Sequence, residues 1–138
     1  MLMADEIIAI ARHFAAALDR CDYEEAAHFI SSECACSVGT ETLVGPQAII
    51  ASYRESSDWG ARVLDSVAYE SSVRSVPVGA RVRFVDHITH RGQSHTYRCH
   101  QYLEFDAGGL ITHILHEEIL GEREALDAFF TRCGIRRR

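Results

Sequence analysis

The order of apolar and polar residues divides the chain into a helical first part and a second part made of strands. Apolar residues recur at helical spacing from about residue 5 to residue 20, which predicts a first amphipathic helix. Asp22 followed by Glu25 has the form of a capping box and predicts a short second helix. A segment that alternates around Gly39 predicts a brief hairpin, and Pro46 then marks the first turn of a third helix.

From residue 62 onwards, polar and apolar residues alternate in long runs separated by Gly, Pro and Ser. Four strands of an antiparallel sheet are therefore predicted, over residues 62–76, 79–90, 94–105 and 110–119. A last helix over 122–133 should end at Gly134 in a left-handed cap, and the arginine tail at about 135–138 should be frayed. Helices first and a meander afterwards predict an α+β fold, with the helices on one face of a curved sheet.

Composition adds limits to this picture. A chain of 138 residues with 47% hydrophobic residues is expected to form a single domain over 1–138. The formal charge of -6 provides no basic surface for nucleic acid, and no membrane-spanning or secretory segment is recognised, so we expect a cytoplasmic protein. The five cysteines are odd in number and lack a CxxC pair, which suits reduced thiols. Lysine is absent, which excludes Schiff-base chemistry.

The stretch "DHITHRGQSHTYRCHQ" holds the densest group of candidate functional side chains. His87 and His90 are three residues apart, and on a strand an odd separation places side chains on opposite faces. Such a pair cannot chelate one ion as HExxH does on a helix. His90, His95 and His116 with Asp86 are the right ligand types for zinc or ferrous iron, but two of these histidines flank a turn. We expect no metal and no cofactor.

Strand pairing separates this stretch into two faces. If Gly92 and Gln93 form a two-residue turn, Asp86 lies opposite Cys99 and Phe84 opposite Gln101. One face is then almost entirely apolar, which makes it the core face. Its members are Ala80, Val82, Phe84, Asp86, Ile88, His90, Tyr97, Cys99, Gln101, Leu103 and Phe105.

Asp86 is the exception in this apolar row. Burial disfavours the charged form of a carboxylate and raises its pKa unless a donor or cation compensates, so Asp86 is a candidate general base. On the last strand, one parity turns His116 inward beside the pocket, and the other parity turns His113 inward instead. The second reading of Asp86 is a structural aspartate that is hydrogen-bonded to a helix.

The sequence also resembles a known family. The segments "HFAAALDRCDYEEAAHFI", "LVGPQAIIASY" and "YLEFDAGGLITHI" are similar to fold markers of the SnoaL-like and ketosteroid-isomerase-like families of the NTF2-like superfamily. This resemblance implies a cystatin-like cone, in which a curved sheet wraps around N-terminal helices and an internal pocket. It also implies a homodimer through the outer sheet face, which here would carry Arg81, Arg83, His87, Arg98, His100 and Glu104.

The catalytic residues of the ketosteroid isomerases have no full counterpart in this chain. Those enzymes use a tyrosine late in the first helix, an aspartate in the first hairpin and an acidic hydrogen-bond donor on the fifth strand. Phe14, about Val38 and Gln101 stand at these positions. Asp86 does match the first aspartate of the limonene-epoxide-hydrolase-like members, where Phe84 replaces their arginine.

Two functions from different classes are expected. The first is a cofactor-independent enzyme in which Asp86 moves a proton and His116 or Tyr97 is the counter-acid, in an isomerisation, dehydration, cyclisation or epoxide opening. The second is a non-catalytic ligand-binding or dimerisation module. In either case a small, apolar molecule would be the ligand, and the expected lining residues are Phe14, Tyr53, Trp59, Phe84, His90, Cys99 and Gln101.

Overall fold

The computed structural model describes residues 2–136. The helices are α1 (Ala4–Asp19), α2 (Tyr23–Ala27), α3 (Pro46–Val63) and α4 (Glu122–Arg132). The strands are β1 (Ile30–Val38), β2 (Glu41–Val44), β3 (Ser66–Val76), β4 (Gly79–His90), β5 (Gln93–Phe105) and β6 (Ile111–Glu118). These elements confirm the predicted order. Of the expected arginine tail, residues 137 and 138 lie outside the described residues.

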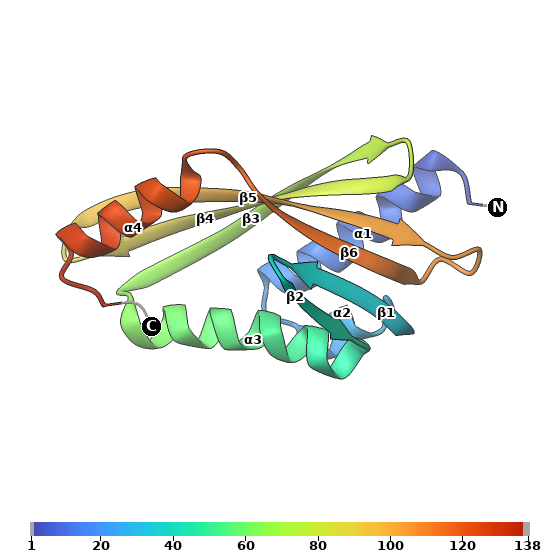
Figure 1. Ribbon diagram of the computed structural model, residues 1–138, viewed down its shortest axis with the longest axis horizontal. Helices are drawn as coiled ribbons and strands as arrows, with labels where there is room; N and C mark the ends of the chain where they lie inside the picture. The colour runs from blue at the N-terminus through green and yellow to red at the C-terminus, as the bar shows by residue number, and fades with distance from the viewer. Residues whose placement is uncertain (1, 137–138) are drawn as a thin grey trace.

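The six strands form one curved sheet in the order β2-β1-β6-β5-β4-β3. The sheet departs from the expected antiparallel arrangement at one place, because β1 and β6 are parallel. Only strands joined by a short turn must be antiparallel, and β1 and β6 are separated by most of the chain. The last strand therefore lies between the first hairpin and the long meander, where Figure 1 shows it crossing in front of the other strands.

The hairpin between β4 and β5 has the predicted faces but a different turn. Arg91 and Gly92, with φ of 50° and 75°, occupy the turn instead of Gly92 and Gln93. Positive φ at both central residues is the geometry of a type I′ turn, which matches the twist of the strands it joins. Asp86 consequently pairs with Tyr97 and not with Cys99. The shift is two residues, so each side chain stays on the predicted face.

Two apolar clusters fill the inner face of the sheet. The larger joins α1, α2 and the first part of α3 to the sheet, and it includes the fully buried Phe14 and Ile49. The smaller lies under α4, where Phe129 packs with Ile88 against the far end of the long strands. Partly buried Phe84 packs against both clusters. The space between the two clusters therefore lies over the middle of β4, close to Asp86.

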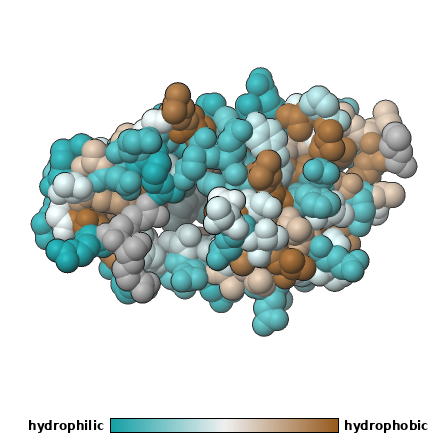
Figure 2. All heavy atoms as spheres, in the orientation of Figure 1, coloured by the Kyte–Doolittle hydropathy of each residue, from teal (hydrophilic) through white to brown (hydrophobic). Residues whose placement is uncertain are grey.

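Apolar side chains at the surface are spread over several elements. The most exposed large apolar residues include Met3, Val44, Val78 and Leu120, which come from different parts of the chain. Figure 2 shows apolar residues in separate groups among hydrophilic ones on the face in view. Within residues 2–136, each helix is too short or too polar to cross a bilayer.

Candidate functional site

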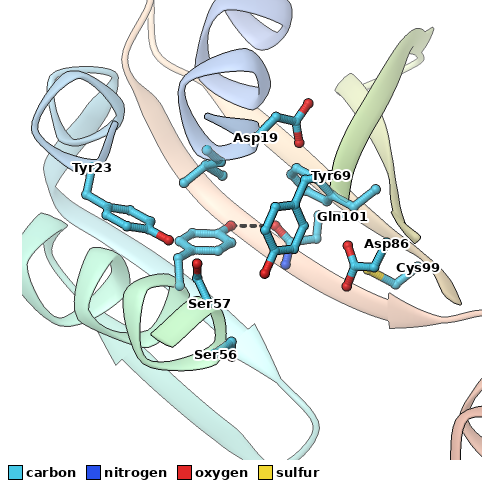
Figure 3. Close-up of a pocket in the computed structure, with 11 residues that line it drawn as sticks. Asp19, Tyr23, Ser56, Ser57, Tyr69, Asp86, Cys99 and Gln101 are labelled. Atoms are coloured by element: carbon cyan, nitrogen blue, oxygen red, sulfur yellow. Dashed lines mark hydrogen bonds between the residues drawn. The ribbon is translucent and has the colours of Figure 1, made fainter. Parts of the chain in front are cut away.

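A pocket of about 200 Å³ lies between the C-terminal end of α1, α2, α3 and the inner face of the sheet. Carboxylates, phenols and hydroxyls converge on it in Figure 3. Its walls are more apolar than polar, as is usual for sites that bind small organic molecules. The lining residues are Leu18, Asp19, Tyr23, Tyr53, Ser56, Ser57, Tyr69, Phe84, Asp86, Cys99 and Gln101.

Asp86 lies in the wall made by β4. The pKa of its carboxyl is raised to about 6, chiefly by burial and also by the nearby Asp19 carboxylate, while His87 has a smaller, opposite effect. Among residues 2–136, no backbone or side-chain group donates a hydrogen bond to this carboxylate. Its oxygens are therefore available to a molecule in the pocket. A carboxyl of this pKa is largely ionised at neutral pH and can still bind a proton.

Asp19 is the last residue of α1 and supplies a second carboxylate. The Ser71 hydroxyl donates a hydrogen bond of 2.5 Å to Asp19 Oδ2. Burial raises the pKa of Asp19, Glu70 raises it as well, and the hydrogen bond from Ser71 acts in the opposite direction. Two carboxylates from different elements thus face one pocket, each with its charged form disfavoured.

Three phenols surround the carboxylates. Burial raises the pKa of Tyr23 to about 12 and also raises the pKa of Tyr69 and Tyr53, so all three are neutral near pH 7. Tyr69 is the direct cross-strand neighbour of Asp86. The Ser57 hydroxyl lowers the pKa of both Tyr23 and Tyr69, which places it beside these two phenols. The pocket therefore offers neutral hydroxyl donors next to a free carboxylate.

A chain of hydrogen bonds runs from the pocket wall into the sheet. The Tyr53 hydroxyl donates to Gln101 Oε1, and the Gln101 amide contacts His116 Nδ1 at 3.3 Å. His116 faces inward because a bulge at Thr112 resets the alternation of β6, so that Ile111 and Ile114 are both buried. Of the two parities considered for the last strand, the structure therefore has the one that turns His116 inward, and His113 is exposed.

Tyr53→Phe should destabilise the protein by about 1–2 kcal/mol, because it leaves the buried Gln101 carbonyl without its donor. Tyr102→Phe is the matched control, since its hydroxyl makes a bond of 3.3 Å to Glu117 at the surface. Urea unfolding of the three proteins measures the difference. An equal, small loss in both variants would contradict a structural role for the Tyr53 hydroxyl.

Tyr97 belongs to a second polar group, which lies beside α4. Its hydroxyl donates to Glu118 Oε2, and Arg123 donates to Glu118 Oε1 at 2.7 Å. The Arg123 guanidinium also lies 5.2 Å from the centre of the Tyr97 ring. Burial raises the pKa of Tyr97, and these contacts hold its hydroxyl at Glu118.

The structure brings five of the predicted site residues together in the pocket. Tyr53, Phe84, Asp86, Cys99 and Gln101 all line it. These are residues whose inward direction on a strand or helix could be read from alternation or helical spacing.

The other predicted site residues lie elsewhere. Phe14 is fully buried one layer behind the pocket, where its ring packs against Tyr53. Trp59 packs on Phe130 of α4, and His90 lies at the end of β4 with Nδ1 3.4 Å from an Asp65 carboxylate oxygen. Like these three, the predicted counter-acids do not line the pocket, since Tyr97 is held by Glu118 and His116 is reached only through Gln101.

Some lining residues were not predicted. Tyr69 could have been found, because the alternation of β3 places it on the same face as its neighbours Val67 and Ser71. Asp19 and Tyr23 could not, because their distance from Asp86 depends on how α1 and α2 pack on the sheet. No local pattern in the sequence encodes that packing.

The chemistry of the pocket is that of oxygen and sulfur side chains. Burial raises the pKa of the Cys99 thiol to about 12, so it is a neutral thiol in the wall near pH 7. Within the described residues, no three His, Cys, Asp or Glu side chains converge in a way that could hold a metal ion. The residues here can accept a proton at a carboxylate and donate hydrogen bonds from phenols.

Comparisons with known proteins agree on the fold. No protein-family model matches the sequence, and no curated protein is significantly similar to it. The solved structure of AclR, a candidate hydroxylase from Streptomyces galilaeus, is 14% identical over 96% of this chain and 98% of its own, with a TM-score of 0.69. A candidate polyketide cyclase from Xanthomonas campestris is 15% identical over 88% of this chain and 96% of its own, with a TM-score of 0.68.

A third similar structure is a designed protein. It is described as a de novo designed protein with a curved β-sheet, and it is 15% identical over 95% of this chain and 99% of its own, with a TM-score of 0.62. At identities this low, the likeness shows a shared architecture alone. The chain therefore shares the α+β fold of these structures, with a curved sheet wrapped around its helices.

Proposed function

We propose that the pocket binds a small organic molecule and that Asp86 acts there as a general base. The observation that supports this most is a carboxylate with a pKa raised to about 6 that accepts no hydrogen bond from residues 2–136 and faces an open pocket. A base works best when its pKa lies near the working pH. The candidate cyclase and hydroxylase with this fold add support, as their descriptions concern enzymes.

In this proposal Tyr69 replaces the counter-acids expected from the sequence. Asp86 takes a proton from the bound molecule, and the neutral Tyr69 phenol on the adjacent strand donates a hydrogen bond to the oxygen or nitrogen on which negative charge develops. Tyr97 and His116 have their hydrogen-bonding groups directed to Glu118 and Gln101. The reaction class stays that of an isomerisation, dehydration, cyclisation or epoxide opening.

A test of the base needs no natural substrate. The probe 5-nitrobenzisoxazole opens to a coloured phenolate when a base removes the C–H proton of its isoxazole ring. We expect the protein to accelerate this opening with an apparent pKa near 6, because only the ionised carboxylate acts as a base. Asp86→Asn should lower the rate at pH 7.5 at least tenfold, and Asp58→Asn, an exposed site on α3, should leave it unchanged.

Two results would contradict the assignment of Asp86. One is a rate in Asp86→Asn equal to that of the parent protein, and the other is a pH profile without a transition between pH 5 and 7. Folding of each variant is checked by far-ultraviolet circular dichroism, so that a lost activity is not a lost fold.

A second candidate function is ligand binding without chemistry. It is supported by two hydrogen bonds, from the Tyr53 hydroxyl to Gln101 and from the Tyr97 hydroxyl to Glu118. Because both hydroxyl protons are already donated within the protein, neither phenol is free to protonate a ligand. A ligand that raises the melting temperature without forming a product, as judged by mass spectrometry, would favour it.

A further inference from the structure

We propose that the ligand of this pocket carries a positive charge, as an ammonium or another basic nitrogen group. This inference rests on the proposed function in using the same pocket, but it requires no proton transfer. The lining contains two carboxylates and no Arg or His side chain. An organic molecule with a carboxylate or phosphate would meet only like charge there, whereas a cation would be attracted by both acids.

The charges around the pocket do not compensate the two carboxylates. The raised pKa of both Asp19 and Asp86 has burial as its largest cause, and each has a further acid as a neighbour, Glu70 for the first and Asp19 for the second. His87 is the one group that lowers the pKa of Asp86. It extends to the opposite face of the sheet, where its ring contacts Glu70.

Two arginines that neighbour lining residues are directed elsewhere. Arg54 lies over the ring of Tyr23 at 5.0 Å, and it lines one depression on α3 and another between α2 and α3, and not this pocket. Arg20, next to Asp19 in sequence, is exposed and lies 3.6 Å from Asp22. A cationic ligand would therefore supply the positive charge that the protein itself does not place in the pocket.

Aromatic rings provide the second half of the site. Three tyrosines and Phe84 line the pocket, and the faces of such rings attract cations, especially when water is excluded. Figure 3 shows the Tyr69 side chain in the pocket between the carboxylates of Asp19 and Asp86. Because burial keeps the phenols of Tyr23, Tyr53 and Tyr69 neutral, these rings can contact a cation through their π faces, and their hydroxyl oxygens can accept hydrogen bonds from an N–H group, without adding charge.

Three small benzene derivatives test this ligand class, because they share the ring and differ in the charge of the group attached to it. We expect benzyltrimethylammonium to bind at least tenfold more tightly than benzyl alcohol, and benzoate to bind most weakly, in isothermal titration calorimetry at pH 7.5 and 150 mM salt. The salt suppresses general attraction to a chain with a formal charge of -6.

Variants separate the pocket from the surface. Asp86→Asn and Asp19→Asn should each weaken binding of the cation and leave that of benzyl alcohol nearly unchanged, whereas Asp58→Asn should alter neither. Tyr69→Leu should weaken cation binding more than Tyr69→Phe, which keeps the ring. Near pH 6, binding of the cation should release protons to the buffer, because it favours the ionised carboxylates. At pH 8 this release should disappear.

Equal affinity for the three compounds, or tightest binding of benzoate, would overturn the assignment of a cationic ligand. So would cation binding that Asp86→Asn and Asp19→Asn leave unchanged. Benzyltrimethylammonium has no N–H proton to lose, so its binding is independent of whether Asp86 is a base. If the benzisoxazole opening depends on Asp86 while the cation does not bind, the ligand class is wrong and the base is correct. If the cation binds while the benzisoxazole opening does not depend on Asp86, the ligand class is correct and the base is wrong.

Discussion

Asp86→Asn should make the protein more stable at pH 7.5, by up to about 3 kcal/mol. The pKa of Asp86 rises from 3.8 to about 6 on folding, and each pKa unit corresponds to about 1.4 kcal/mol. Because the folded state binds this proton more tightly than the unfolded state, stability falls as the pH rises from about 4 to about 6. Above pH 6 the deficit is constant. Asparagine has no such deficit, because it does not ionise.

Urea unfolding of both proteins between pH 4 and 8 measures this effect. The two stabilities should approach each other as the pH falls to 4, where the aspartic acid is protonated in the folded state and partly protonated in the unfolded state, and should differ most above pH 6.5. Asp58→Asn corrects for the loss of one negative charge from the chain. A difference that is the same at pH 4 and pH 8, or an Asp86→Asn protein that is less stable at pH 7.5, would contradict the raised pKa. A carboxylate that lowers stability is a feature that a binding or catalytic role would explain.

Phe129→Ala should have the largest effect, a loss of about 3–5 kcal/mol in the free energy of unfolding. Phe129 is fully buried, stacks on His95 with ring centres 5.1 Å apart and lies under Arg132 of its own helix. Truncation leaves a cavity between α4 and the sheet that rigid neighbours cannot fill. Since small domains have only about 5–15 kcal/mol of stability, α4 should detach at moderate urea concentrations.

The control for Phe129→Ala is Ala128→Gly, at an exposed position of the same helix. Glycine costs about 1 kcal/mol of helix propensity and removes no packing. If both variants lose the same small amount, α4 contributes to stability through its own helix and not through the cluster it forms with Ile88 and Tyr97.

The faces of the β4–β5 hairpin were predictable even though its register was not. Side chains on a strand repeat every two residues, so an error of two residues moves Cys99 from one partner to another and leaves it facing inward. The turn itself was missed because Arg91 adopts a positive φ of 50°, which few residues other than glycine do. Asp86 was recognised because one carboxylate in an apolar row is visible in the sequence.

Contacts between distant segments account for most of what the sequence did not predict. His100 lies on the predicted outer face, but it is buried because Arg83 donates to its ring and Glu117 lies 3.3 Å from it. Long side chains of neighbouring strands cover it, and their conformations follow from the finished sheet. Asp19 reaches the pocket for a similar reason, through the packing of α1 on β3 and β4.

The position of β6 in the sheet has a consequence for how the chain folds as it is made on the ribosome. β1 and β5 both pair with β6, so neither has its second neighbour until the segment Ile111–Glu118 has been synthesised. Pairing of Ile30 with Ile111 closes a loop of most of the chain, and such distant contacts slow folding. A nascent chain that ends before Ile111 would expose two strand edges, which can pair with other chains. Chaperone dependence during synthesis should therefore end only when the last strand emerges.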